Sequence, residues 1–448
     1  MVMATKHSLQ LLAMLIFLIS LLALTKPTMA DDDIPEDFSS SYFPDDFIFG
    51  TATSAYQIEG EATTKGRGPS VWDTFSKETP ERILDGSNGD VAVDFYNRFK
   101  EDIANVKNMG FKGFRMSISW SRVIPSGRRR EGVNKEGIEF YNNVINEIIS
   151  NGLEPLLLFF IGTLLKPRGQ PIHGGQIGIT LFTFWYEPLS NEPADVEAAK
   201  TALDFMFGLW MDPMTYGTYP RTVRDLVGDR LPKFTDEESK LLRGSYDFLG
   251  LQYYTSYYAK PNATVDPNHI RYKTDNHITE TPYDYDGNLI GPQAYSSWFY
   301  IFPKGIRHLL NYTKDTYNNP VIYITENGVD NNNNETQPIE EALQDEFRIN
   351  YYRKHLWNAL GSLKNYSVNV KGYFAWSYLD NFEWNIGYTS RFGLYYVDYK
   401  DNLKRYPKDS AKWFTKFLKH SPKKPLQSNK IYEVTSRNSR KVGKYYIM

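Results

Sequence analysis

Short apolar runs alternate with amphipathic helical patterns along most of the chain. A short continuous apolar run is typical of a strand buried on both faces, whereas apolar positions three and four residues apart predict a helix. The predicted strands cover residues 47–52, 113–120, 154–160, 177–185, 246–254, 321–325 and 371–377. The predicted helices cover residues 90–109, 133–150, 195–211, 303–317 and 340–360. Alternation of strands and helices predicts a parallel α/β fold.

The alternation fails once, between residues 161 and 176. Six glycines and prolines in this stretch exclude a helix, although a connection between parallel strands usually contains one. The pattern therefore gives seven strands where eight would close a barrel. We predict a TIM-type (β/α)8 barrel that is incomplete, with about one β/α unit missing between residues 160 and 177.

The run Pro320–Gly328 ends in a carboxylate, Glu326, followed by the turn-forming pair Asn327-Gly328. In a barrel of parallel strands the chemistry lies at the carboxyl ends of the strands. Burying a charged group at a strand end is energetically costly unless the group has an ionic or hydrogen-bonding partner or takes part in a reaction. Glu326 is therefore a candidate catalytic residue, and a helix-capping carboxylate or a buried ion pair is the alternative.

The N-terminus resembles a secretory signal peptide over residues 1–30, with Lys6 and His7 before an apolar run at 9–24 and small residues before Asp31. A membrane anchor is the alternative, but the run is short for spanning a bilayer, so we expect no membrane segment in the mature chain. Residues 31–448 contain no repeat or linker, which predicts a single domain with a basic, solvated tail from about residue 419.

Four N-glycosylation sequons follow the N-terminal segment, starting at Asn262, Asn311, Asn334 and Asn365. Each sequon is a weak signal alone, but with a signal peptide they favour a glycoprotein of the secretory pathway. The expected destination is extracellular, in the apoplast, or in a vacuole.

The amino-acid composition excludes several kinds of chemistry and of binding partner. The chain has no cysteine, which excludes disulfides, thiolate catalysis and cysteine-based zinc sites. A net charge of −2 gives no electrostatic case for nucleic acid. An aromatic content of 15% suits a sugar-stacking cleft, and equally a large core with many surface tyrosines. We expect no metal and no cofactor, and no sequence feature indicates an oligomeric state.

Four stretches carry a resemblance that covers about residues 43–417. They are Phe49–Gly60, Arg115–Arg122, Ile324–Gly328 and Asn381–Trp384. With these motifs in this order, the chain resembles plant β-glucosidases of glycoside hydrolase family 1. The resemblance implies a (β/α)8 barrel, retaining hydrolysis of β-D-glucosides and small-molecule glucoside substrates.

The resemblance also implies roles for single residues. Glu326 would be the nucleophile, Arg115 would stabilise its ionised form, and Tyr254 would donate a hydrogen bond to it. Glucose would be bound by a set of polar and aromatic side chains: Gln57, Tyr254, Trp376, Glu383, Trp384 and Phe392. The alternatives are core packing for Trp376 and Phe392, and a loop ion pair for Glu383.

One part of the family pattern is missing. Family members continue from the third strand into a His-Trp-Asp motif and end the fourth strand with Asn-Glu-Pro, whose Glu is the acid/base. Here Phe160 is followed by Ile161-Gly162-Thr163, and the pattern resumes near Gly175. The usual loop disulfide falls in the same stretch. Gln252 is a second departure, where the family usually has Asn.

The triplet Asn191-Glu192-Pro193 reproduces the missing motif, but it follows the strand at 177–185 and leads into a helix. We therefore do not expect Glu192 to be the acid. Three hypotheses remain at this point: a secreted or vacuolar β-glucosidase in shortened form with impaired activity, a sugar-binding pseudoenzyme, and a splice product without function.

Overall fold

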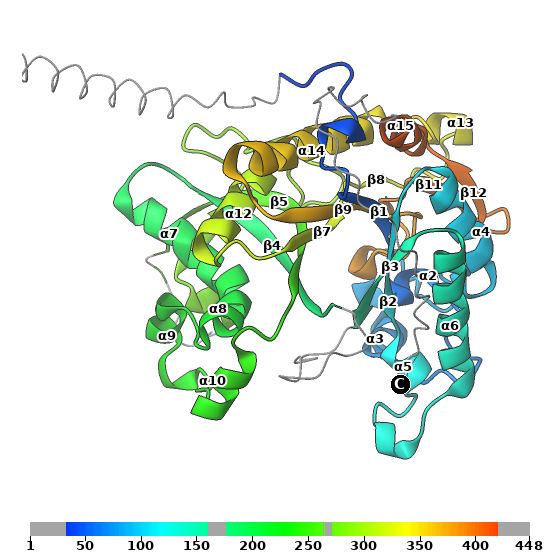
Figure 1. Ribbon diagram of the computed structural model, residues 1–448, viewed down its shortest axis with the longest axis horizontal. Coiled ribbons are helices and arrows are strands. Elements are labelled where there is room, and N and C mark those ends of the chain that lie inside the picture. Colours follow the sequence, from blue (N-terminus) through cyan, green and yellow to red (C-terminus); the bar gives the residue numbers. More distant parts are fainter. Residues whose placement is uncertain (1–32, 160–175, 263, 265–270, 420–448) are drawn as a thin grey trace, which may run out of the picture.

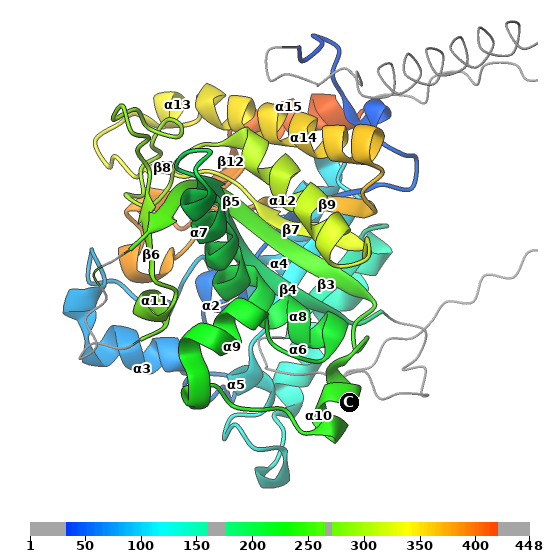
Figure 2. The same ribbon diagram turned by 90° about the vertical axis from the view of Figure 1, so that its left-hand side faces the viewer.

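The computed structural model describes residues 33–159, 176–262, 264 and 271–419. Seven parallel strands form one curved sheet in the order β3-β2-β1-β9-β7-β5-β4, and helices cover its outer face (Figures 1 and 2). This arrangement confirms the predicted α/β fold of the barrel type. The strands are β1 (Ile48–Ala52), β2 (Gly113–Ile118), β3 (Glu154–Phe159), β4 (Gly178–Pro188), β5 (Phe248–Pro261), β7 (Ile322–Asn327) and β9 (Val370–Trp376).

The longer helices lie between consecutive strands, as the sequence pattern predicts, except for α15, which follows the last strand. They are α4 (Phe95–Asn108), α6 (Lys135–Ser150), α7 (Pro193–Leu203), α8 (Leu209–Tyr216), α12 (Pro303–Thr316), α14 (Glu346–Tyr366) and α15 (Asp409–Leu418). Shorter helices lie in the loops: α2 (Ala55–Ile58), α3 (Val71–Glu78), α5 (Trp120–Val123), α9 (Arg221–Val227), α10 (Asp236–Leu242), α11 (Tyr272–Asp275) and α13 (Ile339–Ala342). No helix in the described ranges is long and apolar enough to cross a bilayer.

Small antiparallel strands complete the loops. They are β6 (Ile278–Thr281) against β5, β8 (Asn331–Asn332) against β10 (Ser390–Arg391), and β11 (Tyr395–Asp398) against β12 (Lys404–Pro407). The strand predicted over residues 246–254 is longer than expected, because β5 continues to Pro261 and β6 pairs with its extension.

Two predicted helix boundaries are also wrong, each for a backbone reason. The first helix begins at Phe95 instead of residue 90, because Ala92 and Asp94 have left-handed φ angles of 50° and 58° that a helix does not accept. The helix predicted over 195–211 is interrupted by a π-helical turn at Asp204–Gly208. Such a turn inserts one residue into the helical repeat, which sequence periodicity does not reveal.

Aromatic side chains fill the barrel floor near the start of β1. The Phe43 and Phe47 rings lie 4.8 Å apart, and each packs on the ring of Phe49. Phe417 of α15 contacts Phe49 from the outside, with 5.5 Å between ring centroids. Full burial of one such ring is worth about 1.5–3 kcal/mol, so this cluster fixes the last helix against the first strand.

The strand register brings the carboxyl ends of several strands to one level. Ala52 at the end of β1 is opposite Arg115 of β2 on one side and Trp376 of β9 on the other. Gln252 of β5 is opposite Glu326 of β7, next to an irregularity in the pairing. Five residues from five different strands therefore lie toward one edge of the sheet.

β3 and β4 are the two ends of the sheet path, and neither has a second strand partner among the described residues. These two strands flank the stretch where the sequence pattern fails. β3 is described as far as Phe159, and residue 160, where the strand was predicted to end, lies outside the described residues. The same holds for residues 161–175, the N-terminal segment 1–30 and the tail after 419.

We expect this pair of edges to make the protein prone to aggregation, because an unpaired edge offers free backbone groups to another chain. Phe182 on β4 is 41% exposed and adds apolar surface there. Soluble yield and size-exclusion profiles should show low recovery and large species. The variant Phe182→Lys should increase the monomer fraction, because edge charges oppose pairing. A wild-type monomer with a sharp, cooperative melt would contradict this expectation.

Candidate active site

Glu326 lies at the end of β7 and is held by three side chains from two other strands of the sheet, β2 and β5. Arg115 Nη2 of β2 lies 2.5 Å from Glu326 Oε1, and Gln252 Nε2 of β5 donates to the same oxygen at 2.5 Å. Tyr254 Oη donates to the other oxygen, Oε2, at 2.6 Å. Glu326 is only 9% exposed, so these contacts act in a medium of low dielectric. The arrangement fixes the positions of both carboxylate oxygens.

Arg115 is itself fixed from two sides. Its Nη1 donates to the carbonyl oxygen of Thr53 at 3.1 Å, and its guanidinium lies 5.8 Å from the ring centroid of Trp376. Trp376 ends β9, is 4% exposed, and its carbonyl oxygen accepts a hydrogen bond from Tyr352. The predicted sugar platform is therefore within 6 Å of the cation that contacts Glu326.

Gln57 joins the loop after β1 to the loop after β9. Its Nε2 donates to Asn381 Oδ1 and to the carbonyl oxygen of Phe382, both at 2.8 Å, and to Glu383 Oε2 at 3.2 Å. Gln57 is 1% exposed, so its side chain is buried against this loop. The structure thus brings two of the predicted sugar-binding residues, Gln57 and Glu383, into direct contact.

Glu383 is an unusual carboxylate because of its surroundings. Burial, followed by the negative charges of Asp330 and Glu326, raises the pKa of Glu383 well above its ordinary value. Its Oε1 atom is buried and has no hydrogen-bond partner among the described residues. Buried polar atoms normally have partners, so an unpartnered oxygen beside Glu326 is suited to contact a hydroxyl group of a ligand.

Tyr254 and the remaining aromatic residues border this group. Burial and the charge of Glu326 raise the pKa of Tyr254, which keeps its hydroxyl protonated as a donor. Phe392 is 4% exposed and meets the Tyr254 ring edge-to-face at 6.1 Å. Trp384 stacks against Tyr56, with centroids 6.3 Å apart and an interplanar angle of 10°. All eight predicted site residues therefore lie on strands β2, β5, β7 and β9 or in the segments that follow β1 and β9.

The loop that carries Asn381–Trp384 is anchored by a buried ion network. Asp380 Oδ1 contacts Lys408 Nζ at 2.7 Å, and its Oδ2 contacts Arg391 Nη1 at 2.6 Å. Burial alone would raise the pKa of Asp380, but Lys408 and Arg391 lower it below its usual value. Two cations thus hold Asp380 charged, which fixes the position of the next residue, Asn381.

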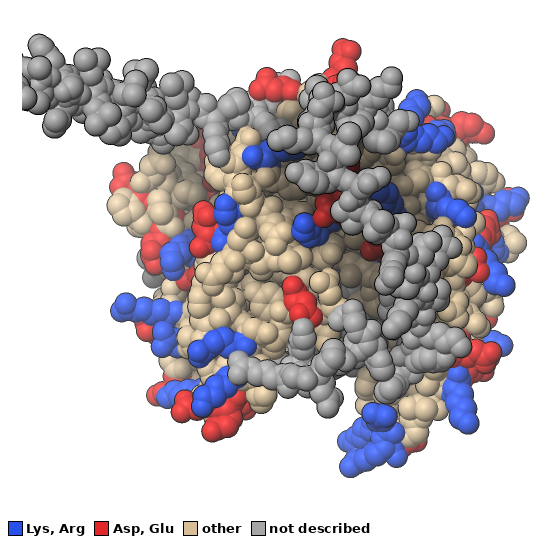
Figure 3. Space-filling view, in the orientation of Figure 1, with Lys and Arg blue, Asp and Glu red and all other residues tan. Residues whose placement is uncertain are grey.

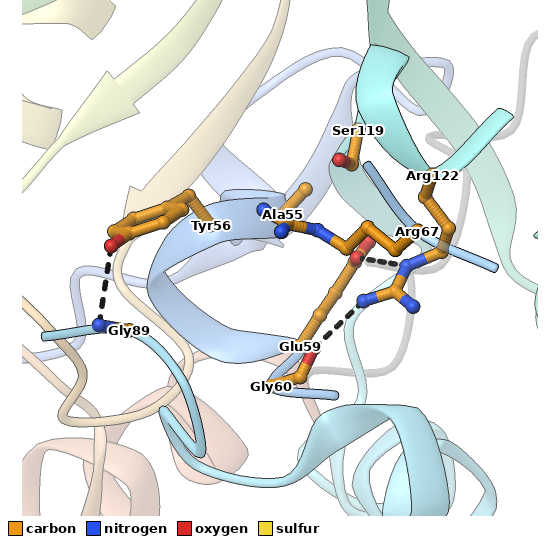
Figure 4. Close-up of a pocket in the computed structure, with 8 residues that line it drawn as sticks. All are labelled: Ala55, Tyr56, Glu59, Gly60, Arg67, Gly89, Ser119 and Arg122. Carbon is orange, nitrogen blue, oxygen red and sulfur yellow. Dashed lines mark hydrogen bonds and ion pairs between the residues drawn. The ribbon is translucent and has the colours of Figure 1, made fainter. Parts of the chain in front are cut away.

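A second buried ion pair anchors Gln57 from the opposite side. Arg122 Nε contacts Glu59 Oε2 at 2.9 Å, and Arg122 Nη2 donates to the carbonyl oxygen of Gly60 at 2.7 Å (Figure 4). Tyr141 Oη donates to the other Glu59 oxygen at 2.7 Å. The turn that follows Gln57 is therefore tied to α5 and α6 through buried polar contacts.

A small pocket lies at this ion pair and not at Glu326. It is lined by Ala55, Tyr56, Glu59, Gly60, Arg67, Gly89, Ser119 and Arg122 (Figure 4). Its lining contains neither Glu326 nor the three side chains that hold it, so the chemistry of the carboxylate site is independent of this pocket. Its position beneath the Gln57 turn gives it a structural role.

Glu192 lies away from these residues, as the sequence predicts. It is exposed and immediately precedes α7, after the end of β4. On the face in Figure 3, acidic and basic side chains are interspersed around the periphery, which agrees with the small net charge.

Sequence reasoning missed three residues that the structure places in the site. Gln252 was noted only as a departure, yet its two-residue spacing from Tyr254 on one strand puts both side chains on the same face. Asn381 belongs to a quoted motif and binds Gln57. Asp330 is 1% exposed, accepts from Ser296 and Ser390, and acts on Glu383 across the loops. Of these three residues, only Gln252 could have been found from a local feature of the sequence, namely its spacing from Tyr254.

Comparison with known proteins shows to which family the chain belongs. The pattern of the family described as "Glycosyl hydrolase family 1" matches residues 39–161 and 165–422. The chain belongs to glycosyl hydrolase family 1. The match covers every strand of the sheet and all the residues that surround Glu326, so the predicted resemblance is confirmed.

Two relatives and one solved structure are examples of the proteins to which this chain is similar. Beta-glucosidase 12 of Oryza sativa subsp. indica is 43% identical over 472 residues, covering 84% of this chain and 92% of that protein. Raucaffricine-O-beta-D-glucosidase of Rauvolfia serpentina is 40% identical over 543 residues, covering 94% of this chain and 100% of that protein. A rice beta-glucosidase mutant in a covalent complex with glucose has a TM-score of 0.81 and 37% identity, covering 86% of this chain and 100% of that chain.

Proposed function

We propose that the protein acts on β-D-glucosides as a retaining glycosidase, with Glu326 as the nucleophile. The observation that carries the proposal is the fixation of both Glu326 oxygens by Arg115, Gln252 and Tyr254 at the end of a barrel strand. A retaining glycosidase needs one carboxylate that stays ionised and attacks the anomeric carbon. Arg115, Gln252 and Tyr254 hold the Glu326 carboxylate in one fixed position, as such an attack requires.

The neighbouring residues fit a bound glucose. Gln57, Glu383 and Trp384 provide polar groups, and Trp376 and Phe392 provide apolar walls beside Glu326. Sugars are bound by such combinations, because their hydroxyl groups need hydrogen bonds and their C–H faces pack on aromatic rings. The solved rice relative in covalent complex with glucose supports glucose as the sugar.

We further propose that this chain is a shortened form that lacks the acid/base carboxylate, and that its activity is impaired. Three observations support this. The sequence lacks the Asn-Glu-Pro stretch after Phe160, and the family match is interrupted between residues 161 and 165. The alignment to Beta-glucosidase 12 is longer than the whole chain, although it contains only 84% of it, so it includes gaps on this chain's side. Finally, β3 and β4 end the sheet path on either side of that stretch.

The route of the protein through the cell is a separate proposal. We infer that the chain enters the secretory pathway through residues 1–30 and is processed near Asp31. The basic start, the apolar run and the four sequons support it.

Covalent labelling tests the assignment of Glu326. An activated 2-deoxy-2-fluoro-β-glucoside should add the mass of one fluoroglucosyl group, located by peptide mapping on Glu326. The variant Glu326→Gln should take up no label, because an amide does not attack the anomeric carbon.

The matched control is Glu187→Gln. Glu187 lies at the end of β4, where Trp185 and His308 contact its carboxylate, so this change removes another strand-end carboxylate without touching Glu326. Labelling should persist in this variant. A folded wild-type protein that takes up no label, or one labelled at another residue, would contradict the proposed nucleophile.

A further inference from the structure

The four sequons that the sequence treats alike lie in different structural settings. Asn334-Glu335-Thr336 follows β8 in an exposed loop, whereas Asn311-Tyr312-Thr313 lies inside helix α12. Asn365 lies in the last turn of α14, and the sequon at Asn262 includes Ala263, which lies outside the described residues. The first two sequons give the sharpest contrast, since every residue of both is described.

In the loop sequon, the asparagine and threonine side chains meet. Asn334 Oδ1 accepts hydrogen bonds from the Thr336 hydroxyl at 2.8 Å and from the Thr336 backbone N–H at 3.1 Å. Among the described residues, Asn334 Nδ2 has no hydrogen-bond partner, and both side chains are exposed. The amide nitrogen that a glycan would occupy therefore points away from every internal contact.

The base of this loop is rigid. Asn333 Nδ2 donates to the carbonyl oxygen of Tyr388 at 2.9 Å, and Arg391 Nε donates to Asn333 Oδ1 at 2.8 Å. The loop begins shortly after Glu326 in the sequence, on the strand-end side of the barrel. A group attached to Asn334 would stand outside this anchor without disturbing the Phe392 segment.

In the helical sequon, the same residue types are separated. Residues two apart in an α-helix do not face each other, so the Thr313 hydroxyl cannot reach the Asn311 amide. Thr313 is fully buried and donates to the carbonyl oxygen of Leu309 at 2.7 Å. Asn311 Oδ1 is also buried, on a helix that packs against α14. A glycan at Asn311 would therefore have to be attached without a threonine hydroxyl beside the amide.

We propose that the folded protein carries an N-linked glycan at Asn334 and none at Asn311. The reaction forms a bond between Asn334 Nδ2 and the anomeric carbon of an oligosaccharide carried on a lipid pyrophosphate. It breaks the bond from that carbon to the pyrophosphate, which leaves with the lipid, and releases one amide proton. This inference does not depend on the proposed glycosidase activity.

The test uses the full chain behind a host secretory leader, expressed in a eukaryotic secretory host. Peptides from the secreted fraction, or from the protease-resistant luminal fraction, are treated with an amidase that converts each glycosylated asparagine to aspartate. Mass spectrometry should find aspartate at position 334 and unmodified asparagine at position 311. Thr336→Ala should remove the modification at 334, and Thr336→Ser should retain it.

A helix-breaking variant tests whether the helical structure or the local sequence prevents modification at Asn311. His308→Pro interrupts α12 and should allow modification at Asn311 in the luminal protein while leaving that at Asn334 unchanged. Modification at Asn311 in the folded wild-type protein would overturn the proposal. An unmodified Asn334 in a host that modifies the His308→Pro variant at Asn311 would overturn it as well.

Discussion

Mixed with 2,4-dinitrophenyl β-D-glucoside, the protein should release about one equivalent of phenolate in a burst and then turn over slowly. The phenolate is a good leaving group that needs no proton, so Glu326 can attack without a general acid. If the acid/base carboxylate is missing, as proposed, the glycosyl-enzyme then persists, because no carboxylate activates water. General acid/base catalysis is typically worth about 10²–10⁴ in rate, and the second step should be slowed by that amount.

Azide should restore turnover, because this anion attacks the glycosyl-enzyme without a base. The product should be β-glucosyl azide, identified by mass spectrometry. Cellobiose, whose leaving group needs a proton, should give no measurable glucose. Glu326→Gln serves as the control and should abolish the burst.

One outcome would contradict the missing acid/base. Rapid cellobiose hydrolysis that Glu192→Gln abolishes would make Glu192 the acid, in spite of its exposed position before α7.

Removing the cation of the buried pair below Gln57 should cost more stability than a comparable change on the surface. Arg122 is completely buried, and its Nε and Nη2 atoms contact Glu59 and Gly60. In Arg122→Met the carboxylate of Glu59 keeps Tyr141 but loses its cation. Breaking a buried pair in this way costs about 3–5 kcal/mol, because a charge remains without compensation. The measurements are the thermal and urea unfolding midpoints of the soluble fraction.

The matched control is Arg221→Met. Arg221 pairs with Asp225 at 3.3 Å, but the two side chains are 86% and 64% exposed. An exposed pair of this kind contributes about 0–1 kcal/mol. Equal midpoints for the two variants would show that the Glu59–Arg122 pair is not a main support of the fold.

The sequence by itself determined the strand–helix order and the candidate nucleophile. Burial of β7 on both faces needs an uninterrupted apolar run, and the first charged residue after that run is Glu326. The edges at β3 and β4 agree with the failure of the pattern after Phe159. These features are local, so periodicity and turn residues are sufficient to predict them.

The partners of Glu326 were decided by tertiary structure, except where a family resemblance supplied them. Gln252 reaches Glu326 because β5 and β7 are neighbours in one particular register. Burial, followed by the charge of Asp330 on another loop, raises the pKa of Glu383. No local pattern encodes such pairings, because they depend on which strands become neighbours when the sheet curves.

Tertiary structure also decides how the sequons at Asn311 and Asn334 differ. Asn311 and Asn334 begin motifs of the same type, and the sequence offers no rule that ranks them. Helix α12 buries Thr313 and turns it away from Asn311, whereas the loop after β8 brings Thr336 back to Asn334. Sequence sets which groups are present, and the packing of α12 against its neighbours sets which of them another molecule can reach.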